Sequence, residues 1–337
     1  MGSPKFQSIE AYTRKSYYVG NELSDSMGLY KLYHPIQMGK ITDWDLFENI
    51  IDYAFYKLKV DPSVVNVLYA IHPQMTRPEK ERLTEVFFNK YQVAGFYFVM
   101  DSLLNMYSGG FQTGLVVSMG AGSIRIVPIY QGYKMEHAIQ YLDLGGTVLD
   151  SFMFKKLQEV GFQTDSSVRK EIGRVLKEKA CFVSLDYDED MKRGLKYKKE
   201  YSLPDGSILE LGKERFEVPE LLFKPDLFNL EEKSLPEAIL DSIDLCDLDI
   251  RTELLENIFL SGGASQFPQL EYRLQNELEL GLIQRGKKMR KPHIIAPGNP
   301  FSCWIGGSIL SLIPEFQNSW ISRSQYYKDG IPDAMLD

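Results

Sequence analysis

Three glycine-containing stretches carry the residue types best suited to holding a ligand. Residues 118–123 place Gly120 and Gly122 between two apolar runs, and Gly262 and Gly263 follow the apolar run 258–260. Glycine removes the side chain that would keep a ligand away and leaves backbone N–H groups as donors, which suits a phosphate. An ordinary hairpin turn is the alternative interpretation of residues 118–123.

The surroundings of the second stretch also suit an anion. A strand at 258–260 precedes Gly262 and Gly263, and a helix with Leu270, Leu274 and Leu278 on one face follows them. Such a turn places an anion at the positive end of a helix. The stretch 304–308, with Gly306 and Gly307, is interpreted as a third glycine turn. Three such turns predict a nucleotide cleft between two domains.

The histidines and cysteines do not form a pattern that binds a metal ion. None of the four histidines has a second histidine or cysteine at ligand spacing, and the three cysteines stand singly. The sequence therefore predicts no histidine- or cysteine-based metal site and no disulfide framework. Unpaired cysteines are typical of a reducing, intracellular compartment.

The charge balance argues against a nucleic-acid partner. The chain has 38 Lys and Arg against 46 Asp and Glu, a net charge of −8, which is the wrong sign for a phosphate backbone. No apolar run reaches the roughly 18 residues that span a bilayer, and the first residues lack the apolar core of a signal peptide. We therefore expect no direct nucleic-acid binding and no membrane insertion.

Helices and strands are expected to alternate along the chain. Thr42 and Asp43 precede an apolar stripe typical of an amphipathic helix, and the run 64–71 is typical of a buried strand. A second helix is predicted from Pro78 and another over 101–107, whereas residues 1–42 read as loops and short strands. The alternation predicts an α/β fold, and 337 residues suggest about two domains.

From about residue 6 to 330, ordered motifs resemble those of actin and the actin-related proteins. In chain order they are 18–22 (YVGNE), 34–36 (HPI), 41–44 (ITDW), 127–133 (VPIYQGY), 142–146 (LDLGG), 177–181 (KEKAC), 203–206 (LPDG), 214–216 (ERF), 260–263 (LSGG) and 304–308 (WIGGS). The resemblance implies the two-lobed α/β fold shared by actin, sugar kinases and chaperone ATPases, with ATP and a divalent cation between the lobes.

The resemblance also implies where each lobe lies in the sequence. The first lobe would comprise 1–108 and 301–337, with a small outer subdomain at about 1–33. The second would comprise 109–300, with an outer insertion at about 147–235. The family's first phosphate hairpin has no counterpart before residues 6–17, which resemble a subunit-contact loop, so the first lobe is expected to be N-terminally incomplete. A partner or rearranged residues 1–33 would then cover its sheet edge.

By the same resemblance, a set of residues would contact the nucleotide. They are Gly120, Gly122, Gly146, Lys177, Glu178, Gly262, Gly263 and Phe267, the last standing where the family has a tyrosine. Four positions depart from the family pattern, namely Asp101, Ser118, Ala121 and Arg125.

These departures predict the loss of ATP hydrolysis. Ser118 and Ala121 replace the two carboxylates of the family's hairpin, Asp101 replaces a glutamine that orients water, and Arg125 replaces a histidine. Magnesium would not be well held, because it requires carboxylates or phosphates in place of some of its waters. Each such loss typically lowers the rate on the order of a hundredfold. We expect negligible ATPase activity, with either ATP or ADP bound without efficient turnover or an empty cleft.

The resemblance further implies a groove that binds protein partners. It would be lined by Tyr107, Gly110, Gly132, Tyr133, Leu310, Ile313 and Phe316, although the same residues could simply pack an interdomain core. We therefore expect a structural, actin-related subunit of a filament or multiprotein assembly in the cytoplasm and cytoskeleton, or in the nucleus. The alternative is a polymerising, nucleotide-binding ATPase.

Overall fold

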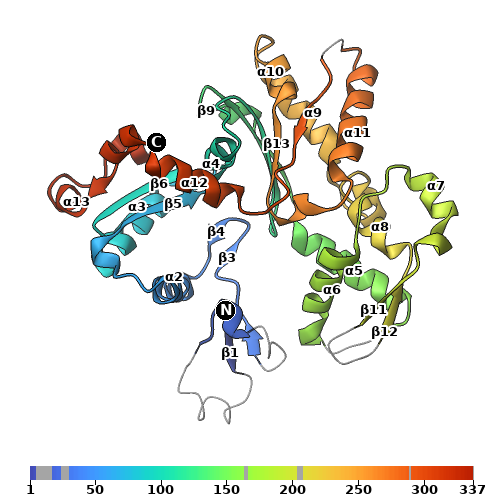
Figure 1. The fold of residues 1–337 in the computed structure, drawn as a ribbon, viewed down its shortest axis with the longest axis horizontal. Helices are drawn as coiled ribbons and strands as arrows, with labels where there is room; N and C mark the ends of the chain where they lie inside the picture. The colour runs from blue at the N-terminus through green and yellow to red at the C-terminus, as the bar shows by residue number, and fades with distance from the viewer. Residues whose placement is uncertain (5–16, 24–29, 163–165, 203–207, 288–289, 337) are drawn as a thin grey trace. The chain divides into compact units, whose positions relative to one another are not determined.

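The chain folds into two compact units, which are described separately. The computed structural model describes residues 1–4, 17–23, 30–162, 166–202, 208–287 and 290–336, so the predictions for 6–16 and for the motif at 203–206 lie outside the described residues. Unit 1 comprises Met1–Leu104 and Ile305–Asp337, and unit 2 comprises Asn105–Trp304 (Figure 1).

Unit 1 is built on a three-stranded sheet with helices packed around it. The strand order is β15 (Ile321–Ser322), β6 (Gly95–Met100), β5 (Asn66–Ile71), with β5 parallel and β15 antiparallel to β6. Its helices include α2 (Trp44–Leu58), α3 (Arg77–Glu85), α13 (Arg323–Asp329) and α14 (Asp333–Leu336). Two short antiparallel pairs precede them: β1 (Gly2–Pro4) with β2 (Tyr30–Leu32), and β3 (Ile36–Gln37) with β4 (Lys40–Ile41).

The helices predicted after Asp43 and from Pro78 are confirmed as α2 and α3, and their N-termini show why they form. The Asp43 carboxylate accepts a hydrogen bond from the Leu46 amide at 3.0 Å and so caps α2. Thr76 and Glu79 form a reciprocal capping box at the start of α3. Lys59, in the left-handed region at φ 54°, ends α2.

The sheet edge at β5 does not gain a strand from the N-terminal segment. Within the described residues, β5 pairs with β6 alone, and β1 and β2 pair with each other. The expectation that residues 1–33 would cover this edge is therefore not met by the described part of that segment. Its described part instead buries a small cluster of its own, formed by Tyr18, Leu23 and Tyr30.

Unit 2 contains a six-stranded mixed sheet. Its order is β10 (Gln140–Leu142), β8 (Ile124–Tyr130), β7 (Gly114–Met119), β13 (Ile258–Ser261), β14 (Ile294–Ile295), and β9 (Tyr133–Lys134) pairs with β8. The predicted hairpin of β7 and β8 is confirmed, and β13 runs parallel to β7 with Ser261 opposite Ser118. All six residues of β7 are buried, as expected for an apolar central strand.

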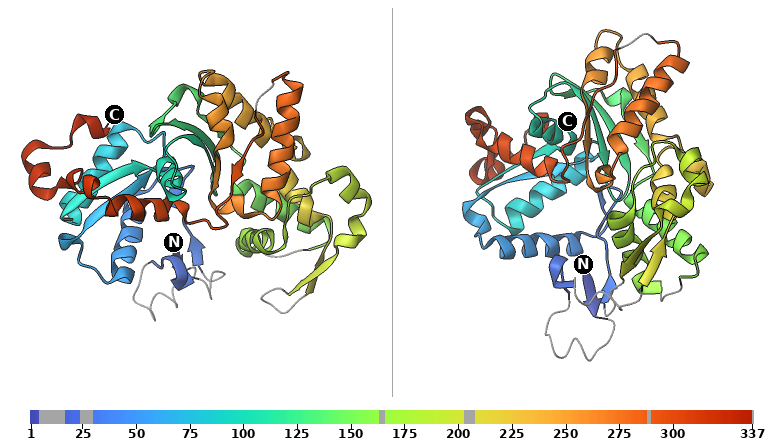
Figure 2. Two further views of the ribbon diagram at one scale, coloured as in Figure 1. Left: turned by 45° about the horizontal axis from the view of Figure 1, so that its top comes forward. Right: turned by 45° about the vertical axis from the view of Figure 1, so that its right-hand side comes forward.

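The helices of unit 2 pack mainly in two groups. They are α5 (Gly146–Glu159), α6 (Ser166–Ala180), α7 (Tyr187–Lys192), α8 (Glu214–Glu220), α9 (Leu235–Leu245), α10 (Arg251–Glu256) and α11 (Leu270–Gln284). Further views show α5 beside α6, and α9 beside α10 and α11 (Figure 2). A hairpin of β11 (Lys199–Ser202) and β12 (Ile208–Leu211) completes the unit.

The third predicted glycine turn is wrong, because Gly306 and Gly307 lie inside a helix, α12 (Ser302–Leu312). A Cβ atom on Gly306 would lie 1.7 Å from the carbonyl oxygen of Leu104, in α4 (Asp101–Ser108). Glycine is therefore required there for the close approach of two helices. The sequence pattern alone does not distinguish that requirement from the conformational freedom of a turn.

Candidate functional site

The tip of the β7–β8 hairpin presents three backbone N–H groups without an acceptor. The Gly120 amide donates to the carbonyl oxygen of Ser123 at 3.1 Å, which closes the turn. The amides of Ala121, Gly122 and Ser123 find no acceptor among the residues that the structure describes. Consecutive free amides form a concave surface that suits an anion, and we call these three the hairpin cradle.

The hairpin tip is docked on the N-terminus of helix α5. The Gly146 amide donates to the Gly120 carbonyl oxygen at 2.9 Å, and the Thr147 amide donates to the Ala121 carbonyl oxygen at 2.9 Å. The next two amides of α5, those of Val148 and Leu149, donate to the carbonyl oxygen of Gly145. All four N-terminal amides of α5 are thus satisfied within the protein, so an anion would be bound by the cradle rather than by this helix end.

This docking depends on Gly145, a residue that the sequence analysis did not single out. A Cβ atom there would lie 2.4 Å from both the Ala121 oxygen and the Gly122 carbonyl carbon. Any other residue would therefore push the hairpin tip away from the helix. The doublet of Gly145 and Gly146 directly before a helix is the signal that could have identified it.

The second glycine turn lies against the base of the same hairpin. Gly262 has φ 88°, and a Cβ atom on it would lie 2.4 Å from the Met119 carbonyl oxygen. The hydroxyl of Ser261 donates to the Ser118 hydroxyl at 3.1 Å. Gly263 is open, with no atom within 4 Å of a Cβ placed there, whereas Phe267 is buried in the main core of unit 2.

Lys177 and Glu178, both on α6, are occupied by partners within unit 2. The Lys177 ammonium lies 2.8 Å from the carboxylate of Asp150 and donates to the Gly146 carbonyl oxygen at 3.2 Å. Burial raises the pKa of Asp150 despite this lysine. Glu178 pairs with Arg174 at 3.0 Å. The structure therefore brings together Gly120, Gly122, Gly146, Lys177 and Gly262 through direct contacts around one hairpin.

Comparison with protein families agrees with this arrangement. A family model described as Actin matches residues 1–332 of the chain. The chain belongs to the actin family. The resemblance carried by the sequence motifs is confirmed, and the mixed α/β sheets of the two units are consistent with the actin-like fold.

In this actin-family chain, the positions that depart from the family pattern have other contacts. Ser118 faces Arg125 across the β7–β8 ladder, and Tyr141 of β10 lies opposite Arg125 on its other side. Ala121 is exposed at the hairpin tip, and Asp101, in unit 1, accepts a hydrogen bond from the Ser102 hydroxyl at 3.0 Å. Across the described ranges, His, Cys, Asp and Glu residues form no group of three that could hold a metal ion.

The residues predicted to line a partner groove are divided between the units. In unit 2, a Cβ atom on Gly132 would lie 3.9 Å from the Tyr107 hydroxyl oxygen, Gly110 has φ 77°, and Tyr133 is 78% exposed. In unit 1, Ile313 is exposed and Leu310 half-buried, whereas Phe316 is buried edge-to-face against Tyr97 and Trp320. Phe316 therefore serves the packing of unit 1.

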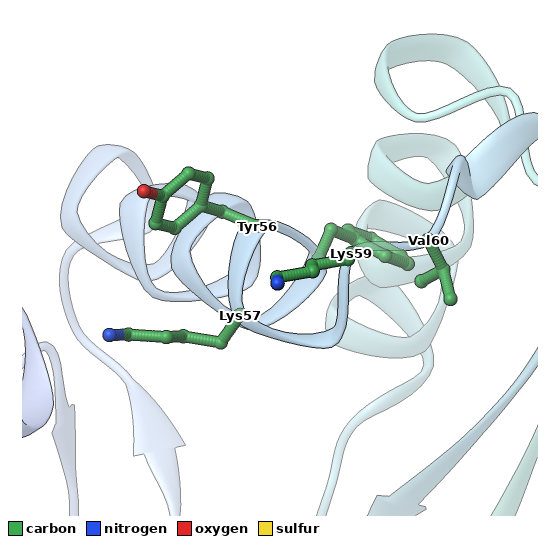
Figure 3. A pocket seen from close by; sticks show the side chains of 5 residues that line it. Tyr56, Lys57, Lys59 and Val60 are labelled. Atoms are coloured by element: carbon green, nitrogen blue, oxygen red, sulfur yellow. The ribbon is translucent and has the colours of Figure 1, made fainter.

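A surface hollow lies at the C-terminal end of α2 in unit 1. It has a volume of about 440 Å³ and is lined by Phe55, Tyr56, Lys57, Lys59 and Val60, four of which are labelled in Figure 3. The Lys57 ammonium nitrogen lies 5.3 Å from the centroid of the Tyr53 ring, and neither lysine forms an ion pair with a described residue. The hollow therefore combines apolar surface with positive charge, a combination that suits a protein segment carrying apolar and acidic residues.

None of the described helices has both the length and the apolar character needed to cross a membrane.

Proposed function

We propose that this actin-family protein is a structural subunit of a filament or multiprotein assembly and that it has lost ATP hydrolysis. The observation that carries the proposal is the hairpin at residues 118–123. It is a tight hairpin whose tip carries backbone amides without an acceptor among the described residues, but Ser118 and Ala121 provide no carboxylate. Catalysis of phosphoryl transfer depends on metal charge and a positioned water, and this hairpin offers groups for neither.

The same hairpin supports binding of ATP or ADP without efficient turnover. The free amides of Ala121, Gly122 and Ser123 fit phosphate oxygens, because they are donors that lack an acceptor among the described residues. A magnesium ion would neutralise phosphate charge if it were bound, but the residues at the hairpin do not fit one. In this proposal, the bound nucleotide has a structural role, and it does not switch the protein between conformations because it is not hydrolysed.

Protein partners follow from the family and from the surface. Actin-family membership suggests protein partners, and the end of α2 exposes Tyr56 and Leu58 by 72% and 69%. Exposed apolar side chains next to lysines that form no ion pair are typical of a surface that another protein covers. We place this subunit in the cytoplasm and cytoskeleton, or in a nuclear assembly.

Two measurements on the purified protein test the loss of hydrolysis. Nucleotide released on denaturation is identified by chromatography, and phosphate release from ATP with magnesium is followed over hours. We expect bound ATP or ADP at most, and no phosphate release above background. Stoichiometric conversion of bound ATP to ADP would contradict the proposal.

A matched variant sharpens this test. Ala121→Asp returns one carboxylate to an exposed position at the hairpin tip. We expect it to strengthen the dependence of ATP binding on magnesium, because a carboxylate can hold part of the metal's hydration shell. Ala121→Asn is the uncharged control.

The alternative function is a polymerising ATPase, favoured by the intact hairpin cradle. It predicts that phosphate release accompanies polymerisation and that filaments change with the nucleotide supplied. Electron microscopy of the protein with ATP and with ADP separates the two functions, because a structural subunit would respond equally to both.

A further inference from the structure

A buried ion pair lies directly behind the hairpin cradle. The ammonium of Lys177 and the carboxylate of Asp150 are 2.8 Å apart, and their side chains are 8% and 13% exposed. The two residues come from different helices, α6 and α5, which pack side by side. The pair therefore forms where the helices meet and is shielded from competing water.

The Lys177 ammonium is close enough to the cradle to serve a ligand there. A Cβ atom on Gly146 would lie 3.2 Å from the Lys177 ammonium nitrogen and 3.4 Å from the Ala121 Cα atom. The lysine nitrogen and the hairpin tip thus flank one glycine. A lysine in such a place would add a charged donor to the three backbone amides of the cradle.

Asp150 prevents this addition. Its carboxylate forms an ion pair with the Lys177 ammonium, which also donates a hydrogen bond to the Gly146 carbonyl oxygen. To reach a ligand, Lys177 would have to leave Asp150 as an uncompensated charge in a buried place, which is costly. The fixed partner therefore keeps the Lys177 ammonium engaged with Asp150 instead of with a ligand in the cradle.

We infer that Asp150 is a positioning residue that withholds Lys177 from the hairpin cradle and thereby weakens nucleotide binding. The inference rests on the proposed binding of ATP or ADP at the cradle. Weak nucleotide binding would then have two causes: the Asp150 side chain, and the absence of carboxylates at positions 118 and 121. The pair also ties α5 to α6, so the same contact stabilises unit 2 while it lowers the affinity.

Isothermal titration with ATP tests the inference. Asp150→Asn keeps the shape of the side chain and removes its charge, which frees Lys177 for the ligand. We expect about tenfold tighter binding than in the wild type, the value of one additional charge-assisted contact. Asp150→Glu keeps the ion pair and should bind ATP as the wild type does.

The double variant Asp150→Asn, Lys177→Met separates positioning from a general change in structure. If Asp150 acts through Lys177, the gain in affinity disappears in the double variant. Thermal unfolding of each protein verifies that it is folded. Equal affinity for the wild type and Asp150→Asn, or a gain that persists without Lys177, would overturn the inference, as would the absence of binding in both.

A pH series gives an independent readout. Arg174, Lys177 and Glu178, all on α6, are the charged groups that act on Asp150, and residues 119–123 of the hairpin carry no titratable side chain. Protonation of Asp150 releases Lys177, so lowering the pH should narrow the difference in affinity between the wild type and Asp150→Asn. A difference that stays constant would contradict the inference. Phosphate release, measured separately, tests the proposed loss of hydrolysis and does not depend on this outcome.

Discussion

At the scale of single residues, Gly145 decides whether the hairpin can dock. Its Cα hydrogen faces the Ala121 oxygen, and a Cβ atom there would lie 2.4 Å from that oxygen. We expect Gly145→Ala to lower the free energy of unfolding by about 1–3 kcal/mol, because the backbone must shift to relieve the overlap. Chemical denaturation measures the change. Gly263→Ala is the matched control, since neither Gly145 nor Gly263 has a positive φ and Gly263 has no atom within 4 Å of a Cβ.

Two of the three cysteines should be chemically inert in the folded protein. Burial raises the pKa of Cys181 to about 12 and that of Cys246 to about 11. Because the thiolate is the reactive form, we expect neither to react with iodoacetamide at pH 8 unless the protein is unfolded. Peptide mass spectrometry reads out each cysteine separately. Rapid labelling of Cys181 in the native protein would show that this core opens in solution.

Single residues also mark the limit of what the sequence could predict about the site. Glycines 120, 122, 146 and 262 were identified from motifs, and contacts in the structure bring them together. Asp150 was missed because it belongs to no motif and reaches Lys177 only after α5 packs against α6. Ligand contacts of all these residues stay a prediction.

At the scale of elements, local signals predicted the helices of unit 1 well. An aspartate cap and an apolar stripe are contained in a short stretch of sequence, and both α2 and α3 form where these signals occur. The same local reasoning failed for α12. Residue 306 must be glycine because its Cα packs against the Leu104 carbonyl oxygen, about two hundred residues away in the sequence. A tertiary contact there determines the residue type, and no local pattern reports it.

The cap of α2 offers a test at this scale. The Asp43 carboxylate satisfies the Leu46 amide, and Leu46 and Phe47 are buried behind it. We expect Asp43→Ala to cost about 1 kcal/mol and Asp43→Asn much less, since asparagine also caps well. Thermal unfolding followed by circular dichroism compares the two. Equal losses in both variants would mean that charge, rather than the capping hydrogen bond, stabilises this end of the helix.

At the scale of the whole molecule, the assignment to the actin family followed from ordered motifs spread along the chain, and the family match over residues 1–332 confirms it. Which segment, if any, pairs with the free edge of β5 could not be predicted in the same way. Strand pairing depends on which segments meet in space, and the described part of residues 1–33 pairs within itself. Partner binding at that edge stays a prediction.

The proposed role in an assembly predicts that the end of α2 contacts another protein. Tyr56 and Val60 line the hollow together with Lys57 and Lys59 and are 72% and 39% exposed, so replacing both by aspartate should leave folding intact. It should weaken assembly, because apolar area is lost and the positive charge is offset. Sedimentation of assembled material, with thermal unfolding as the check on folding, measures the effect.

Ile283→Asp is the matched control for that variant, since Ile283 is also 72% exposed but lies on α11 in unit 2. A loss of assembly confined to the Tyr56→Asp, Val60→Asp protein assigns the contact to the hollow at the end of α2. If both proteins assemble like the wild type, the lysines and apolar side chains at this hollow are an ordinary solvated surface. The prediction that the end of α2 contacts another protein would then be wrong.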